Sequence, residues 1–175
     1  MNIFILDENL DKCAEYHVDK HIVKMPLESA QMLCTIHWIN KYVGHVPRKL
    51  TSDEWGEVSK HKTVDPRPFP YLPTMYNHPC TIWARTSLSN YEWLYTYALA
   101  LGEEYTYRYG KVHKSIDVIL HLPDITLPDN GLTPWAQAMP EGLQQLCAVS
   151  AYRDYYREEK SHLASWKHRE RPAWY

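Results

Sequence analysis

Two histidines, a lysine and a glutamate recur at helical spacing near the start of the chain, and these side chains could act together on a ligand. At about 100° per residue of an α-helix, they fall within an arc of about 60°. An ordinary solvated helix face alternates acidic and basic residues and seldom carries two histidines. Cations and imidazoles around one carboxylate suit an anionic ligand. The residues of this stripe are His17, His21, Lys24 and Glu28, with Lys20 and Gln31 at its edge.

Three kinds of chemistry fit the stripe. Lysines could neutralise a phosphate or nucleotide while a histidine transfers a proton, with Glu28 acting as a base or orienting that histidine. The amine of Lys24 or of the chain's own N-terminus could instead attack a sugar C1′ and form an imine beside a carboxylate. A metal shared by His17 and His21 is the third kind, but the chain offers no second ligand pair for it. We expect no metal and no cofactor, and the remaining alternative is an ordinary polar helix face.

A second group of cations follows the end of a predicted helix, within residues 110–115. Their ammonium and imidazole groups, with the Ser115 hydroxyl, could hold a phosphate. Cations at this place could equally stabilise the negative end of the helix dipole. The predicted substrate-binding residues are Lys20, Arg85, Asn90, Arg108, Lys111, His113 and Lys114, and the predicted catalytic residues are Lys24, Glu28, His21 and His17.

One long helix must carry the stripe. Apolar residues recur at helical spacing over residues 10–42, with Asp7 or Asn9 as the N-cap. Pro26 lies inside this run and lacks a backbone N–H, so it should kink the helix or split it in two. The preceding apolar residues 3–6 should form a short strand or a buried extended leader.

Further helices and long connections complete an all-α fold. The apolar spacing predicts a second long helix over 79–110 and a third over 141–160. Repeated prolines predict irregular loops over 46–79 and 122–140, and the first could form a lid over the stripe. The tail 166–175 carries two tryptophans and should pack back onto the domain.

Composition and charge narrow the class of protein. The chain has 175 residues and a mass of 20.7 kDa, enough for a compact single helical domain spanning residues 1–175. The net charge is -2, so any surface that binds nucleic acid must be local. Four cysteines without a Cys-x-x-Cys pair indicate reduced thiols, and no apolar stretch reaches the length of a membrane span. We expect a cytoplasmic protein with no membrane contact, and the oligomeric state stays open.

Several short motifs carry a family resemblance. A short N-terminal leader precedes a helix with His17 about fifteen residues in, and the chain ends in Arg171-Pro-Ala-Trp174-Tyr175. In these features the chain resembles the phage pyrimidine-dimer DNA glycosylase family, of the endonuclease V type, which has Arg-Pro-x-Trp-Tyr near its own C-terminus. The segments His-Pro-Cys-Thr-Ile-Trp-Ala-Arg and Asn-Tyr-Glu-Trp are similar to those of uncharacterised phage proteins.

The resemblance implies an all-helical protein that flips or unstacks a damaged base and attacks C1′ with its N-terminal α-amine, followed by strand cleavage as a lyase. It also implies a catalytic glutamate seven residues after the helix histidine, where this chain has Lys24, with Glu28 one turn later. We predict a DNA glycosylase/AP lyase-like enzyme acting on a pyrimidine base, with DNA or a free nucleotide as its partner. The alternative is a non-catalytic protein that binds or sequesters a nucleotide. If the chain is phage-encoded, either protein would act in the host-cell cytoplasm.

Overall fold

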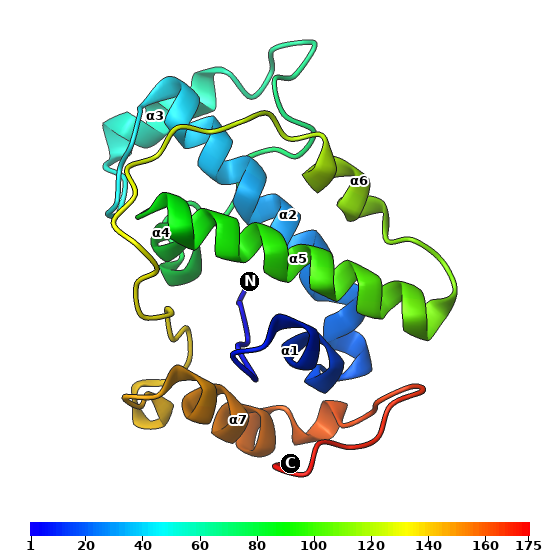
Figure 1. The fold of residues 1–175 in the computed structure, drawn as a ribbon. Helices are drawn as coiled ribbons and strands as arrows, with labels where there is room; N and C mark the ends of the chain where they lie inside the picture. Colours follow the sequence, from blue (N-terminus) through cyan, green and yellow to red (C-terminus); the bar gives the residue numbers. More distant parts are fainter.

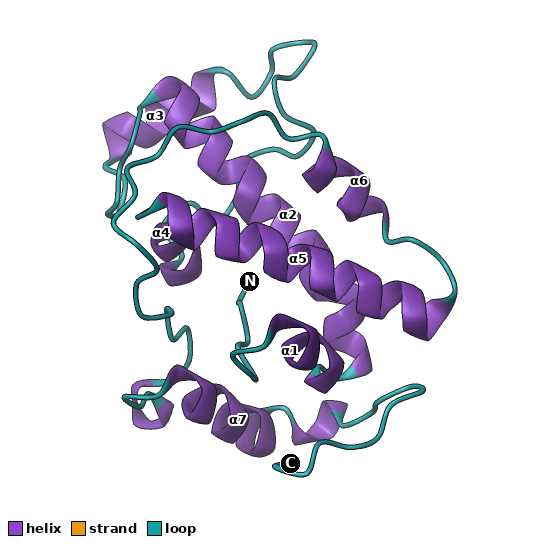
Figure 2. Cartoon of the chain, viewed as in Figure 1, coloured by secondary structure: helices purple, strands orange, loops and turns teal.

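Two long helices, α2 (Asp19–Tyr42) and α5 (Leu88–Tyr109), cross at the centre of the molecule (Figure 1). The computed structural model describes residues 1–175 and contains helices and loops without a strand (Figure 2). The predicted all-α fold is therefore confirmed. α2 and α5 make the most extensive contact between any two helices, and the remaining elements are arranged around them.

Five shorter helices and two 3-10 turns surround the long pair (Figure 1). One short helix packs on α5 beside the leader, one lies at the C-terminal end of α2, one touches both long helices near the start of α5, and one runs along α2 and the end of α5. The fifth short helix, nearest the C-terminus, lies below the N-terminal leader in the view of Figure 1. In chain order they are α1 (Leu10–Tyr16), α3 (Ser52–Lys60), α4 (Pro79–Ala84), α6 (Lys114–Leu120) and α7 (Ala148–Glu159), with 3-10 turns at Glu141–Leu143 and Ser161–Leu163.

The segment predicted as one helix over 10–42 forms α1 and α2, and the break lies at His17 and Val18. Both residues have an extended backbone there. The prediction that Pro26 splits the helix is wrong, because Pro26 lies inside a continuous α2. At the true break, the carbonyl groups of Glu15 and His17 accept hydrogen bonds from the buried Arg108 guanidinium of α5. This distant donor satisfies carbonyls that end a helix, so no local signal marks the break.

The structure also differs from the other two helix predictions, since one of the predicted helices is interrupted and the other begins later. The predicted helix over 79–110 is interrupted between α4 and α5, where Ser87 has an extended backbone. There the Leu88 N–H donates to the Pro128 carbonyl and the Ser87 hydroxyl donates to Asp129. A distant connection therefore supplies the partners that a continuous helix would have supplied itself. The predicted helix over 141–160 begins only at Ala148, after a 3-10 turn.

The N-terminal leader is the extended alternative of the sequence prediction. Residues 3–6 have no strand partner and are buried against α1, α2, α5 and α7 in the main apolar core. Asn9, one of the two predicted caps, accepts a hydrogen bond from the Lys12 N–H at the start of α1. A smaller apolar cluster around Trp38 packs the C-terminal end of α2 against α3.

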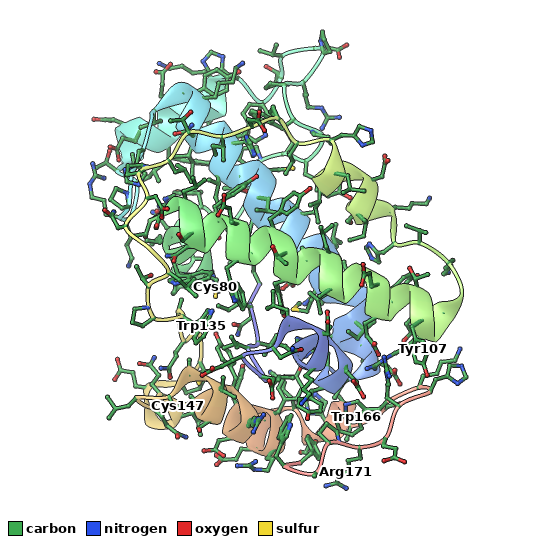
Figure 3. All side chains as sticks on the ribbon, viewed as in Figure 1. Cys80, Tyr107, Trp135, Cys147, Trp166 and Arg171 are labelled. Atoms are coloured by element: carbon green, nitrogen blue, oxygen red, sulfur yellow. The ribbon has the colours of Figure 1, made fainter.

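The C-terminal tail packs back onto the molecule, as predicted. The Trp166 indole donates to the Tyr16 carbonyl at 2.9 Å, and the Tyr107 hydroxyl donates to the His168 carbonyl at 3.2 Å. Figure 3 shows Tyr107 beside the far turn of the tail, with Trp166 and Arg171 on its path to the C-terminus. The tail therefore covers the outer side of α1 and the end of α5.

The cysteines are free thiols, as the sequence predicts. Cys13, Cys34 and Cys80 are buried, and Cys147 is exposed just before α7 (Figure 3). None of the helices combines the length and the apolar character that a bilayer crossing requires.

Candidate functional site

A cavity of about 400 Å³ opens between the N-terminal leader, the first half of α2 and the end of α7. Four of its lining residues come from the predicted stripe or its edge, and they all lie on α2. Met25 also lies on α2, and the remaining residues come from the leader, from the 122–140 connection and from the segment around α7. Its lining residues are Met1, Asn2, Phe4, Lys20, His21, Lys24, Met25, Glu28, Ala138, Tyr155, Lys160 and Leu163.

Glu28 is the buried carboxylate of this cavity, and amines surround it. The Met1 α-amino nitrogen lies 3.4 Å from Glu28 Oε2, and the Asn2 backbone N–H donates to the same oxygen at 3.2 Å. The Lys24 ammonium lies 3.0 Å from Glu28 Oε1. The side chain of Lys24 is 63% exposed, whereas that of Glu28 is only 9% exposed. The cavity therefore contains a shielded carboxylate in direct contact with a primary amine.

The side chain of Asn2 fixes the leader at this place. Asn2 Nδ2 donates to the Ala138 carbonyl at 2.9 Å, and the Tyr152 hydroxyl lies 2.7 Å from Asn2 Oδ1. Tyr152 is fully buried in α7. Segments from the far end of the chain therefore hold the amine against Glu28.

Phe4 bends the leader next to this anchor. Its φ angle is +33°, a left-handed conformation that bulky residues rarely adopt. The Phe4 ring is stacked on His21 at a centroid distance of 4.4 Å and faces Tyr155 at 6.0 Å. The strained backbone is thus held by an aromatic stack that also forms the cavity wall.

His21 is a neutral member of the cavity. Its Nδ1 lies 2.5 Å from the Tyr156 hydroxyl, and the ring is buried. Burial, together with the positive charges of Lys160 and Lys24, lowers the pKa of His21 to about 3. An imidazole with this pKa is uncharged near neutral pH. The positive charge at the cavity therefore comes from the amines, and not from His21.

His17 lies in the core beside the cavity and does not line it. Its Nδ1 is 2.6 Å from the Cys13 carbonyl, and its Nε2 is 3.0 Å from the Tyr97 hydroxyl. Burial and the neighbouring His21 lower the pKa of His17 to about 3. Both ring nitrogens are occupied, so the structure gives His17 the contacts of a packed core histidine. No three His, Cys, Asp or Glu side chains are arranged to hold a metal ion.

Arg108 lies in a separate buried network of charges. Its Nε donates to Glu104 at 2.6 Å, and its Nη1 donates to Asp19 at 3.0 Å. Arg169 from the tail donates to Glu104 as well, with Nη2 2.8 Å from Oε2. We call Asp19, Glu104, Arg108 and Arg169 the Glu104 network. It joins α5 to the start of α2 and to the tail, away from the cavity.

The structure also places Arg85 and Asn90 outside the cavity. Arg85 is buried, and its guanidinium donates to the carbonyls of Val46, Arg48 and Tyr76. These bonds fix the 46–79 segment to the end of α4. The prediction of an irregular loop over 46–79 is wrong in part, because the segment contains α3. No residue of 46–79 lines the cavity, so the segment is no lid there. Asn90 is buried too and exchanges hydrogen bonds with Thr133. The hydrogen bonds of both side chains hold separate segments of the chain together, which is a structural role.

Lys111, His113 and Lys114 gather at another cavity beside α2, between the end of α5 and the start of α6. His113 caps α6 by accepting from the Ser115 N–H. The structure therefore does not bring this group together with Glu28 in one pocket.

Several cavity residues were missed from the sequence, among them two aromatic residues and a lysine. Phe4, Tyr155 and Lys160 come from segments that approach α2 only in the folded chain. The excess of amphipathic aromatic residues in the composition was a general signal for such a pocket. It does not say which aromatic residues form it.

Comparison with known protein families gives one match. A family model described as pyrimidine dimer DNA glycosylase matches residues 1–117. The matched range contains the leader, Glu28 and the Lys111–Lys114 group, and it leaves out the tail motif and Lys160. Searches of curated proteins and of solved structures find no match to the chain.

Proposed function

The chain belongs to the pyrimidine dimer DNA glycosylase family, and from this premise we propose that it is a DNA glycosylase with lyase activity whose nucleophile is the N-terminal α-amine. The observation that carries the proposal is the contact between the Met1 nitrogen and Glu28 Oε2, 3.4 Å apart at a cavity of about 400 Å³. DNA is the substrate that the family implies. A damaged pyrimidine nucleotide is the unit that this cavity would receive.

In the proposed reaction, the neutral amine forms a bond to the sugar C1′ while the bond from C1′ to the base breaks. The base leaves with the electron pair of that bond. Glu28 accepts a proton from the new ammonium, and the nitrogen lone pair then opens the sugar ring by displacing O4′, which takes up a proton. The product is an imine between the amine and C1′. Removal of a C2′ proton from this imine expels the 3′ phosphate and cleaves the strand.

Glu28 lies close to the backbone nitrogens of both Met1 and Asn2. The Met1 nitrogen and the Asn2 nitrogen both lie within 3.4 Å of Glu28 Oε2. If Met1 were removed, the new α-amine of Asn2 would contact the same carboxylate. This supports an N-terminal amine as the nucleophile in preference to Lys24, whose side chain is 63% exposed although its ammonium also contacts Glu28.

Three lysines supply the attraction for an anionic substrate. Lys20 and Lys24 lie on α2, and Lys160 follows the end of α7. Such cations stabilise the phosphates on either side of the reacting nucleotide. The sequence-predicted role of Lys20 is kept in this proposal, and Lys24 becomes a phosphate ligand and a partner of Glu28.

Borohydride reduction tests the imine directly. Wild-type protein incubated with DNA that contains a pyrimidine dimer or an abasic site should form a covalent complex, and mass spectrometry of the trapped peptide should place the adduct on Met1 or Asn2. Glu28→Gln should reduce the trapping rate at least about 100-fold, since a positioned base contributes about that much. Glu103→Gln, an exposed glutamate on α5, is the matched control and should trap like the wild type.

Three outcomes would overturn this proposal. An adduct on Lys24 would exclude the terminal amine, as would undiminished trapping by a chain with two extra residues before Met1. Absence of any adduct, together with tight binding of a free nucleotide, would favour the non-catalytic sequestering protein.

A further inference from the structure

A second cavity, of about 360 Å³, lies beside α2 next to the start of α6, and no acidic residue lines it. Three segments that are distant in the sequence converge there: the Pro-rich loop before α4, the last turns of α5, and the loop that leads into α6. The family comparison names no residue for such a site. Its lining residues are Leu27, Tyr71, Tyr105, Lys111, Val112, His113, Lys114 and Ser115.

Hydrogen bonds fix the walls of this second cavity. The Tyr71 hydroxyl lies 3.0 Å from Ser115 Oγ, and the Tyr71 carbonyl accepts from the Trp38 indole at 2.9 Å. His113 Nδ1 accepts from the Ser115 N–H, so its Nε2 carries the proton and donates to the Val23 carbonyl on α2 at 3.1 Å. Burial lowers the pKa of His113, in keeping with this neutral tautomer. His113 therefore braces the cavity, and the free donors are lysines.

The lysines at this cavity have no carboxylate partner. Lys24 and Lys60 are the only lysines of the chain in ion pairs, so Lys111 and Lys114 are unpaired and exposed. The Tyr105 ring, 4.8 Å from His113, adds an aromatic wall. This cavity therefore combines two free cations with tyrosine rings, as the cavity at Glu28 combines lysines with Phe4 and Tyr155.

An exposed apolar ridge on α2 joins the two cavities. Val23 is 46% exposed and Leu27 is 37% exposed, although both are apolar. Lys20 and Lys24 border the first cavity, and Leu27 borders the second. At 1.5 Å per residue, the stretch from Lys20 to Leu27 spans about 10 Å. In Figure 1, α6 runs alongside α2. The first residues of α6 line the second cavity.

We infer that the ridge and the second cavity bind an unpaired strand of nucleic acid that continues from the nucleotide held at Glu28. Aromatic faces combined with backbone-neutralising cations are the usual means of binding single strands. Exposed Val23 and Leu27 can contact the faces of unstacked bases, which a regular duplex keeps inside its stack. The net charge of -2 also leaves only local cations, too few for strong duplex binding by charge alone. That the strand is DNA rests on the proposed function.

Binding of undamaged DNA tests this inference without any chemistry. The full chain is titrated into a fluorescent single-stranded oligonucleotide and into the duplex of the same sequence, at several salt concentrations. We expect the single strand to bind more tightly. Lys111→Ala combined with Lys114→Ala should weaken single-strand binding about tenfold and reduce the salt slope by about 1.4, since each lost phosphate contact contributes about 0.7. The matched control is Lys41→Ala combined with Lys49→Ala, two exposed lysines in the last turn of α2 and in the loop after it.

A tyrosine variant separates stacking from charge. Tyr105→Leu should weaken single-strand binding several-fold and leave the salt slope unchanged, because it removes a ring and no charge. Tyr95→Leu, earlier on α5, should bind like the wild type. Circular dichroism and thermal unfolding must show that each variant folds, and Lys111→Arg combined with Lys114→Arg should restore binding.

The inference is overturned if the duplex binds as tightly as the single strand, or if the Lys111 and Lys114 variant binds like its control. These outcomes differ from failure of the proposed function. If borohydride traps no adduct but the variants bind as predicted, the proposed enzyme activity is excluded and the single-strand surface is supported. If an adduct is trapped but the variants bind like the wild type, the enzyme activity is supported and the single-strand surface is excluded.

Discussion

Two carboxylates, Glu28 and Glu104, are both buried but face different cations. Glu104 accepts from Arg108 and Arg169, whose guanidinium groups stay protonated at any physiological pH. Glu28 faces the Met1 amine and Lys24, and amines can lose their proton. Glu28 borders a cavity of about 400 Å³ that Lys20, Lys24 and Lys160 also line, whereas the cavity beside Glu104 is only about 200 Å³ and has Arg169 in its wall. A carboxylate held by arginines stabilises the fold, and one held by an amine at a cavity is suited to proton transfer.

The largest effect should come from breaking the Glu104 network. Glu104→Ala leaves the Arg108 guanidinium buried without its closest carboxylate, so the free energy of unfolding should fall by about 3–5 kcal/mol. Glu28→Gln should change this free energy much less, because Lys24 remains exposed to water. Urea unfolding of both variants measures the difference. Equal losses would contradict the distinction between a structural and a chemical carboxylate.

A drop in pH should destabilise the fold through its buried neutral histidines, and His17 can be tested among them. The pKa of His17 is lowered from an ordinary 6.5 to about 3, so between these values the unfolded chain binds a proton that the folded chain excludes. Stability is therefore retained above pH 6.5 and lost as the pH falls toward 3. From pH 7 to pH 5, His17 should account for a loss of about 2 kcal/mol.

His17→Gln removes this titration, so its free energy of unfolding should fall less between pH 7 and pH 5 than that of the wild type. Urea unfolding at the two pH values measures the change. The comparison uses only the pH dependence, because the variant also loses packing. An unchanged pH dependence would mean that His17 is protonated in the folded chain.

A third variant tests whether the amine needs its anchor. Tyr152→Phe removes the hydroxyl that lies 2.7 Å from Asn2 Oδ1 and keeps the buried ring. The same hydroxyl lies 2.7 Å from the Ala136 carbonyl and accepts from the Ala138 N–H, so stability should fall by about 1–3 kcal/mol. If the anchor positions the nucleophile, the maximal trapping rate should fall about tenfold with little change in DNA affinity. Tyr155→Phe, which keeps the cavity ring and leaves Asn2 untouched, is the control, and equal rates for both variants would remove the positioning role.

The sequence predicted the segments that form α1, α2, α4, α5 and α7 and part of the cavity, but it missed α6 and also α3, which lies inside the predicted 46–79 loop. Glu28, Lys20, Lys24 and His21 follow from helical spacing alone, and the structure brings them to one cavity. The break at His17 was not predictable locally, because Arg108 of α5 satisfies the carbonyls there.

Arg85 and Asn90 show the same limit on the other side of the molecule. Both are polar residues of the predicted 79–110 helix, and both were predicted to bind the substrate. Their partners are the carbonyls of a Pro-rich loop and Thr133, groups whose positions only the folded chain defines. Local spacing predicts which face of a helix a residue occupies. It does not predict which distant polar groups meet that residue.

The smallest effect on stability should come from Lys24. Its ammonium contacts Glu28 but is mostly exposed, and such pairs contribute about 0.5 kcal/mol or less. Lys24→Met should therefore leave unfolding nearly unchanged, while the concentration of damaged DNA needed for half-maximal trapping should rise several-fold through loss of a phosphate contact. Lys60→Met, which removes a comparable exposed pair with Glu57, is the control. A large stability loss at Lys24 would place Glu28 with Glu104 among the structural carboxylates, because it would show that Glu28 needs a cation to remain buried. Unchanged DNA affinity would instead mean that Lys24 is an ordinary solvated residue of α2 with no role in DNA binding. Glu28 and the terminal amine would then remain as the proposed reacting groups.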